Sequence, residues 1–220
     1  MACDMAEERD EQPESKLART KQRWAREGRF LAGKTSRAED QRLPPGQHLT
    51  KNWPVLDLGQ KPQISRERWR LDVYGAVEHP IFWDFQRFAA QPQTKSIFDI
   101  HCVTTWSRYD NQWEGPATHD LLKACQPSDG ARFVVLHYHD GYTTNLTLED
   151  FAAEDVLLAH SWSDLPLNQE HGAQCGWYFW KSAKWLQSIE FLISEEPGYR
   201  EVCGYHNRGD PWSEERYCGD

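Results

Sequence analysis

Short stretches in which apolar and polar residues alternate run through the chain from residue 44 onward. Residues 69–74 alternate as a half-buried strand does, and Gly75 follows them. Asp140–Gly141 stands between two such stretches, which predicts a hairpin. The further strands predicted by this pattern are residues 96–102, 132–138, 142–146, 156–161 and 185–193.

Apolar residues follow helical spacing in three short stretches. Residues 83–90 have this spacing and end before Pro92, and residues 148–153 resemble a brief helix. Residues 118–125 form the third helix, with Thr118 as a possible cap and an apolar inner face that ends at Cys125. Strands and helices do not alternate regularly and no internal repeat occurs, so we expect an α+β fold with a mixed sheet in one domain.

The charge of the chain is unevenly distributed, and this sets the expected domain boundary. Residues 1–15 hold six acids and one Arg, whereas residues 16–42 hold nine Lys or Arg and three acids. A Pro-Pro-Gly turn at residues 44–46 ends this part. We therefore predict a charged, flexible arm over residues 1–43, either solvated or bound to a partner, and a folded domain over residues 44–220.

Composition excludes several classes of protein. The chain is 39% hydrophobic and holds 11 Trp, which is unlike a disordered protein. No run approaches the ~18 apolar residues of a membrane span, and the acidic start does not resemble a signal peptide. The net charge of −9 argues against a nucleic-acid partner. We expect a cytoplasmic domain that binds neither membrane nor nucleic acid.

Cysteine is the first candidate for chemistry. The six cysteines lack the paired spacing of a zinc site, and Cys125 lies on an apolar helical face as a core residue would. Cys102 differs because a predicted strand ends there, beside His101, and a polar and aromatic loop over residues 103–113 carries Arg108. Its thiolate could be a soft metal ligand or a nucleophile, and a plain core cysteine is equally consistent with the pattern.

Residues 180–185 are the second candidate. Lys181 and Lys184 enclose Ser182 and Ala183, which would make a compact cationic turn. Backbone N–H groups, a hydroxyl and an ammonium group can together bind a phosphate. An exposed lysine pair without function fits the same residues.

The order of these motifs resembles the sulfite-oxidase-type molybdopterin oxidoreductase domain, most closely its small stand-alone bacterial members. The resemblance covers about residues 44–217. It rests on Cys102 at a strand end, the hairpin at Asp140–Gly141, residues 165–172, the turn at residues 181–185 and the tail at residues 204–217.

This resemblance implies a cofactor and a set of ligands. The Cys102 thiolate would ligate molybdenum, with the molybdopterin dithiolene supplying further sulfur ligands. His171 would contact the cofactor, as would Ser182, Ala183 and Lys184 in the turn and, more weakly, Tyr138. An early loop at residues 52–57 would close over the pterin. No haem or flavin motif is visible, so electrons would pass to an external partner.

The expected function is two-electron oxo transfer on a small substrate, either sulfite or a sulfoxide-like molecule, with Arg108 available to bind an anion. The chain also departs from the family pattern, because residues 174–177 are several residues shorter than the usual strand with its Arg, and Arg200 replaces an aromatic residue. The alternative is a non-catalytic variant that keeps the fold and serves as a binding module.

Overall fold

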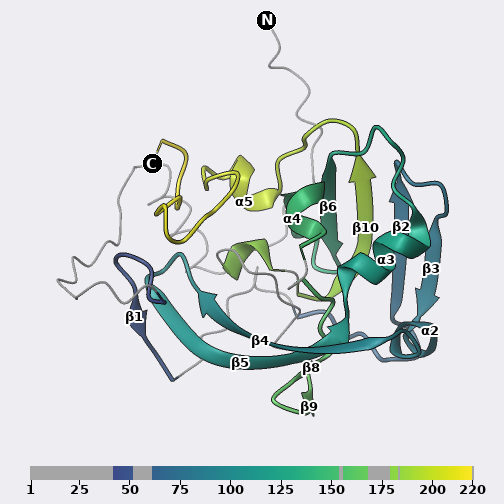
Figure 1. Cartoon of the computed structure of the whole chain (residues 1–220), viewed down its shortest axis with the longest axis horizontal. Helices are drawn as coiled ribbons and strands as arrows, with labels where there is room; N and C mark the ends of the chain where they lie inside the picture. The colour runs from purple at the N-terminus through teal and green to yellow at the C-terminus, as the bar shows by residue number, and fades with distance from the viewer. Residues whose placement is uncertain (1–41, 52–60, 154–155, 168–178, 183, 220) are drawn as a thin grey trace, which may run out of the picture.

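Two mixed sheets form the framework of the molecule (Figure 1). The computed structural model describes residues 42–51, 61–153, 156–167, 179–182 and 184–219. In these residues the first sheet has the order β1-β5-β8-β9, with β4 paired to the long strand β5. Its strands are β1 (His48–Leu49), β4 (Gln93–His101), β5 (Trp106–Pro116), β8 (Ser161–Trp162) and β9 (Leu165–Pro166).

The second sheet has the order β3-β2-β10-β6-β7. Strand β10 comes late in the sequence. It lies parallel to β2 and antiparallel to β6, so the sheet is mixed. This arrangement confirms the expected α+β class with a mixed sheet. The strands are β2 (Arg70–Gly75), β3 (Ile81–Asp84), β6 (Phe133–Tyr138), β7 (Thr143–Thr147) and β10 (Leu186–Leu192).

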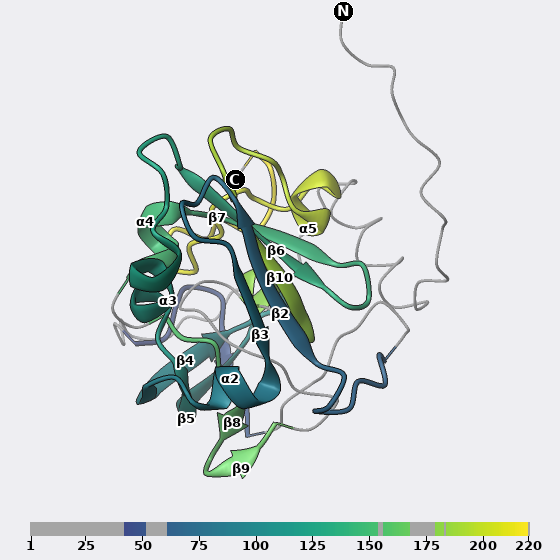
Figure 2. The same cartoon turned by 90° about the vertical axis from the view of Figure 1, so that its right-hand side faces the viewer.

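Short helices cover one face of the second sheet (Figure 2). Helix α3 (Thr118–Cys125) and helix α4 (Leu148–Phe151) pack their apolar residues on it, while α2 (Phe85–Ala89) follows β3. A 3₁₀ turn, η1 (Phe179–Lys181), precedes β10, and α5 (Tyr199–Val202) follows it. Among the described residues no helix is long and apolar enough to cross a membrane.

In the part of the chain that the structure describes, the buried apolar side chains gather into two groups. Leu71, Val134, Phe151 and Ile189 belong to an aliphatic core between the second sheet and its helices. The other group lies on the first sheet and is rich in aromatic residues, and we call it the Cys102 cluster. Its members are Ile100, Cys102, Val103, Trp106, Trp113, Leu157, Ala159, Trp180, Tyr205 and Tyr217.

Two helix predictions need correction at their starts. Trp83 belongs to β3, and the helix begins at Phe85 because the Asp84 carboxylate accepts a hydrogen bond from the Arg87 N–H at 2.8 Å. Thr118 is not a cap. Its buried hydroxyl donates to the Phe151 carbonyl oxygen at 2.6 Å and so ties α3 to α4.

The predicted loop at residues 103–113 is wrong over most of its length, because Trp106–Pro116 is strand β5. Its polar residues hid the alternation, and the positive φ of 57° at Asp110 shifts the register against β4. The strand predicted at residues 156–161 is also shorter than expected. Only Ser161 of it lies in β8, although the Leu158 N–H still bonds to the Pro116 carbonyl at 2.8 Å.

The described chain starts with Arg42, the last basic residue of the predicted arm. Its guanidinium pairs with Asp99 at 2.6 Å and Asp110 at 2.5 Å, where β4 and β5 are irregular. The rest of the predicted arm, residues 1–41, lies outside the described residues. The boundary of the arm therefore stays a prediction. Arg42, next to that boundary, is bound to the first sheet.

Gly115 in β5 lets the segment after α4 pass close to the strand. A Cβ built there would lie 2.1 Å from the Leu158 carbonyl oxygen, a backbone atom that cannot turn away. We expect Gly115→Ala to lower the free energy of unfolding by about 2–3 kcal/mol, measured by urea denaturation. Gly130→Ala is the control, because its Cβ would meet only Ile193 side-chain atoms at 3.6 Å, and it should change stability by less than ~1 kcal/mol. Equal losses in the two variants would contradict the prediction.

Candidate functional site

Cys102 lies in the tight turn that joins β4 to β5. The Cys102 N–H donates to the Trp106 carbonyl at 2.8 Å, and the Thr105 N–H donates to the Cys102 carbonyl at 2.9 Å. Thr105 has a φ of 73°, which closes the turn. The hairpin therefore fixes the backbone of Cys102 from both sides.

The thiol of Cys102 faces a mainly aromatic environment. The residue is 3% exposed, and Sγ lies 3.2 Å from the Thr104 hydroxyl oxygen. Trp106, Trp180 and Tyr205 belong to the cluster around it. In the described part of the chain no three His, Cys, Asp or Glu residues gather into a metal site.

Two segments that are distant in sequence hold this turn. Buried Gln47, just before β1, donates from its amide to the Cys102 carbonyl at 3.1 Å. Buried Arg216, in the C-terminal tail, donates to the Val103 carbonyl at 2.8 Å and to the Pro45 carbonyl at 3.2 Å. The two segments thus fasten the Cys102 turn and also each other.

His101, the residue before Cys102, is held by contacts of its own. Its Nδ1 lies 2.9 Å from the Ser107 hydroxyl oxygen, and the Trp212 ring packs edge-on at 4.9 Å. Burial lowers the pKa of His101 to about 4, so the imidazole is neutral at pH 7. A neutral ring that is hydrogen-bonded to Ser107 is a structural support rather than a charge beside Cys102.

Arg108 lies on β5 opposite Ile100 of β4. Its guanidinium hydrogen-bonds to the Asn111 side chain and lies 4.5 Å above the Trp162 ring. Burial lowers its pKa below the usual range. The structure places Arg108 on the same hairpin as Cys102, with a side chain held by Asn111 and Trp162.

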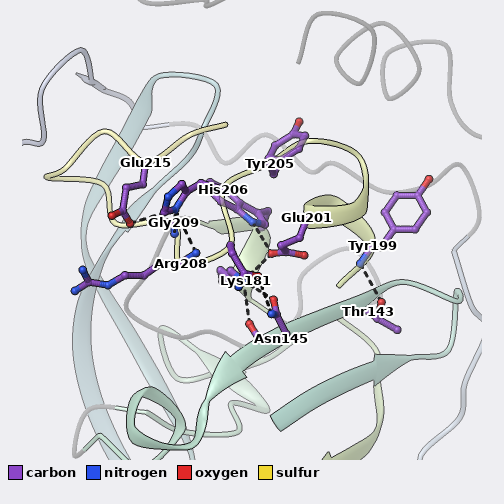
Figure 3. Close-up of polar contacts among 12 residues, drawn as sticks. Thr143, Asn145, Lys181, Tyr199, Glu201, Tyr205, His206, Arg208, Gly209 and Glu215 are labelled. Atoms are coloured by element: carbon purple, nitrogen blue, oxygen red, sulfur yellow. Dashed lines mark hydrogen bonds and ion pairs between the residues drawn. The ribbon is translucent and has the colours of Figure 1, made fainter. Parts of the chain in front are cut away.

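Lys181 does not belong to an exposed cationic turn. It is 1% exposed, and its ammonium pairs with Glu201 at 2.6 Å and bonds to the Asn145 carbonyl and side-chain oxygens at 3.0 and 2.7 Å (Figure 3). Burial lowers the pKa of Lys181 and the Glu201 carboxylate opposes that shift. With three acceptors for its three N–H bonds, Lys181 is structural and not available to a phosphate.

The structure describes three of the remaining residues that were predicted to contact the cofactor. Ser182 is buried directly after Lys181, and the Lys184 ammonium lies 4.7 Å from the centre of the Trp185 ring. Tyr138 is buried at the end of β6 and stacks on Tyr142 with 5.1 Å between ring centres. His171, Ala183 and the early loop at residues 52–57 lie outside the described residues.

His139 was not predicted as a site residue. Its position shows whether the surroundings of Ser182 and Lys184 suit a polar cofactor. The backbone N–H of His139 donates to the Trp185 carbonyl at 3.0 Å, which brings the residue next to Trp185. Its Nε2 is buried and has no hydrogen-bond partner in the described structure. Burial lowers the pKa of this imidazole. A buried ring nitrogen needs a polar partner, which can be water or a ligand, and a pterin or phosphate held by Ser182 and Lys184 would be such a partner.

The C-terminal tail supplies residues that the sequence did not single out. Tyr205 packs on Trp180 with 5.4 Å between ring centres, and the Gly209 backbone passes close to the same indole. His206 Nδ1 accepts from the Arg208 and Gly209 N–H groups at 3.2 Å (Figure 3). The tail was noted as a motif, but nothing in its pattern showed that it covers Cys102.

Comparison with known proteins decides the family. The model of the family described as "Oxidoreductase molybdopterin binding domain" matches residues 58–200. The chain belongs to this family. The match confirms the resemblance and the molybdopterin-dependent oxidoreductase class inferred from the motifs.

Individual relatives agree with this assignment. An uncharacterized oxidoreductase, YuiH, of Bacillus subtilis (strain 168) is 44% identical over 195 residues, which are 86% of this chain and 98% of the relative. A nitrate reductase [NADPH] of Fusarium oxysporum is 25% identical over 196 residues, which are 68% of this chain and 21% of that protein. In fold, the chain resembles the sulfane dehydrogenase SoxCD of Paracoccus pantotrophus with a TM-score of 0.61, at 17% identity, over 72% of this chain and 48% of that chain.

Arg216 offers a direct test of how the Cys102 turn is held. We expect Arg216→Gln to make alkylation of Cys102 about tenfold faster, because a lost charge-assisted hydrogen bond lowers the free energy of local opening by roughly 1.5 kcal/mol. Pulse labelling with iodoacetamide and peptide mass spectrometry would identify the labelled cysteine. Arg208→Gln changes an exposed arginine in the same tail and should leave the rate unchanged. An unchanged rate in Arg216→Gln would show that the hairpin alone holds the turn.

The buried ion pair makes a second prediction. Lys181→Met should lower the free energy of unfolding by about 3–5 kcal/mol, because Glu201 stays buried with its charge unpaired. Lys184→Met, three residues beyond η1, should lower the free energy of unfolding by less than ~1 kcal/mol. Urea denaturation of the two variants measures the difference, and equal costs would mean that Lys181 is not the structural residue of the turn.

Proposed function

We propose that this oxidoreductase carries out two-electron oxo transfer at a molybdenum–molybdopterin cofactor on a small substrate, sulfite or a sulfoxide-like molecule. The observation that carries the proposal is the position of Cys102. A buried thiol in a rigid turn, inside an aromatic cluster and within a molybdopterin-binding family, fits a soft thiolate ligand for the metal.

Different residues of the chain would ligate the metal, bind the cofactor and exclude water. Cys102 would supply the protein ligand, held in orientation by the hairpin, Gln47 and Arg216. Ser182, Lys184 and the Nε2 of His139 would bind the pterin and its phosphate, with Tyr138 packed nearby. His171 and Ala183 stay proposed contacts from the sequence. The Trp and Tyr rings would exclude water from the thiolate side.

When bound, molybdenum would supply a two-electron change of oxidation state and an exchangeable oxo group. Arg108 would contribute positive charge on the same hairpin. Because the chain shows no flavin or haem motif, we propose that a separate protein or small carrier exchanges the electrons. We also propose that the protein works in the cytoplasm, without a membrane or nucleic-acid partner.

The alternative is a family member that keeps the fold, binds the cofactor poorly and acts as a binding module. The shortened segment at residues 174–177 is what favours it, since an extended strand gains about 3.3 Å per residue and losing several residues shortens the reach to the turn. That segment lies outside the described residues. The alternative expects sub-stoichiometric molybdenum in the protein purified from a host that makes the cofactor.

The proposal is tested by changing the thiol. We expect Cys102→Ser to lose molybdenum and redox activity while unfolding at the same urea concentration, because a hard hydroxyl oxygen replaces a soft ligand. Cys125→Ser is the control: this thiol is buried in the aliphatic core, where burial raises its pKa to about 11, and the hydroxyl should cost stability but not molybdenum. Metal analysis by mass spectrometry gives the occupancy. Full occupancy in Cys102→Ser would remove Cys102 from the site.

A further inference from the structure

The last described segment of the chain forms a loop that closes on itself. Residues 204–218, which we call the tail loop, follow helix α5 and belong to neither sheet. Tyr205 pairs with Tyr217 as an antiparallel bridge, and the Cys218 N–H donates to the Gly204 carbonyl at 3.0 Å. A compact loop whose ends meet in this way can open as one unit.

Hydrogen bonds inside the tail loop preserve its shape. The Glu215 carboxylate accepts from the Asp210 N–H at 2.9 Å, and the Asp210 carboxylate accepts from the Trp212 N–H at 2.9 Å. His206 Nδ1 accepts from two further backbone N–H groups of the loop at 3.2 Å (Figure 3). These bonds do not involve the rest of the domain, so we expect the loop to keep its form when it moves.

Side chains hold the tail loop against the domain. The Asn145 amide donates to the Asn207 side-chain oxygen at 2.8 Å, and Arg216 donates to the turn that carries Cys102. The Trp212 ring packs on the imidazole of the residue before Cys102, with 4.9 Å between ring centres. A segment held by side chains opens locally at a lower cost in free energy than a strand bonded inside a sheet.

The tail loop also covers the thiol of Cys102. Tyr205 and Tyr217 belong to the Cys102 cluster and are 3% and 8% exposed, and Cys102 itself is 3% exposed. Other members of the cluster are held more firmly, because they lie in β4 or β5, or in η1 beside the buried ion pair. A cofactor of the size of molybdopterin cannot reach so buried a thiol unless a covering segment moves. Of the covering segments that the structure describes, the tail loop is the one outside the sheets and outside the ion pair.

Gly204 provides a hinge between α5 and the tail loop. Its φ is 92°, and no atom lies within 4 Å of the place where a Cβ would stand, so the backbone has room to rotate. We propose that the tail loop opens as one unit about Gly204, admits molybdopterin to Cys102 and then closes over it. The identity of the cofactor rests on the proposed function, whereas the opening rests on the contacts of the loop.

Gly209 is the position at which a substitution can force the opening. A Cβ built there would lie 2.7 Å from the Trp180 indole, and that ring is held in place because its N–H is bonded to Glu201 at 3.2 Å. Gly209→Ala should therefore displace the tail loop. Gly141→Ala is the matched control, because the two glycines have φ values of 78° and 82° and so give similar backbone strain. A Cβ at Gly141, however, meets nothing within 4 Å.

The first measurement is the rate at which iodoacetamide alkylates Cys102 in the full chain without cofactor. We expect Gly209→Ala to raise this rate by about tenfold or more and Gly141→Ala to leave it unchanged. Cys125, fully buried in the aliphatic core, should stay unlabelled in every chain, because the loop opens while the core stays folded.

Labelling of Cys125 separates local opening from loss of the fold. If Gly209→Ala labels both cysteines, that variant is unfolded and Asn207→Ala takes its place, because this change removes the bond to Asn145 without adding a clash. A Cys102 rate in the folded variant that equals the rate in the parent chain would overturn the inference.

The second measurement is molybdenum uptake by the full chain, supplied with molybdate and with molybdopterin released from a denatured molybdopterin enzyme. We expect the folded variant to take up molybdenum faster than the parent chain by the same factor as the alkylation, since one opening limits both. Bound cofactor should in turn slow trypsin cleavage after Arg208, an exposed residue of the tail loop. Uptake at the parent rate in a variant whose Cys102 is alkylated faster would overturn the inference alone. No uptake by any chain would contradict the proposed function and the inference with it.

Discussion

The buried ion pair between Lys181 and Glu201 is the constraint that organises the functional side of the molecule. Both side chains are almost fully removed from water, so neither charge is tolerable without the other. The pair ties η1 to α5, and the bonds from Lys181 to Asn145 add β7. Three segments that are far apart in sequence are thereby fixed against one another.

This constraint positions residues that the ion pair itself does not use. Ser182 directly follows Lys181, so the proposed cofactor turn starts from a fixed point. Arg200 directly precedes Glu201, and because Glu201 faces inward to Lys181, the neighbouring guanidinium is presented to the tyrosines. One interaction in the interior thus fixes both the start of the proposed cofactor turn and the position of Arg200 among the tyrosines.

Much of the second sheet could be predicted from sequence, because its strands alternate clearly and its hairpin has an Asp–Gly turn. The first sheet was harder to predict. Strand β5 carries polar side chains and a left-handed residue at Asp110, which together break the period of two. Its true signal was the pair of buried tryptophans, Trp106 and Trp113, which an alternation pattern alone does not separate from a loop.

For the candidate site, too, the sequence showed some features and not others. Cys102 is singled out by sequence because a strand end and a family motif coincide there, and the Lys pair is singled out by its spacing. Spacing could not show that Lys181 is buried, since that depends on Glu201, twenty residues further on. The roles of Gln47 and Arg216 were equally hidden, because each bonds to backbone carbonyls, which leave no trace in side-chain pattern.

The link from Arg216 to Val103 has a consequence for the order of events during synthesis. The two residues are separated by 113 positions, so the hairpin that carries Cys102 leaves the ribosome long before its final support exists. Until the tail arrives, the buried carbonyl of Val103 lacks this donor and the aromatic cluster lacks Tyr205 and Tyr217. In the nascent chain the Cys102 turn therefore lacks this support, and a segment made much later is the one that supplies it.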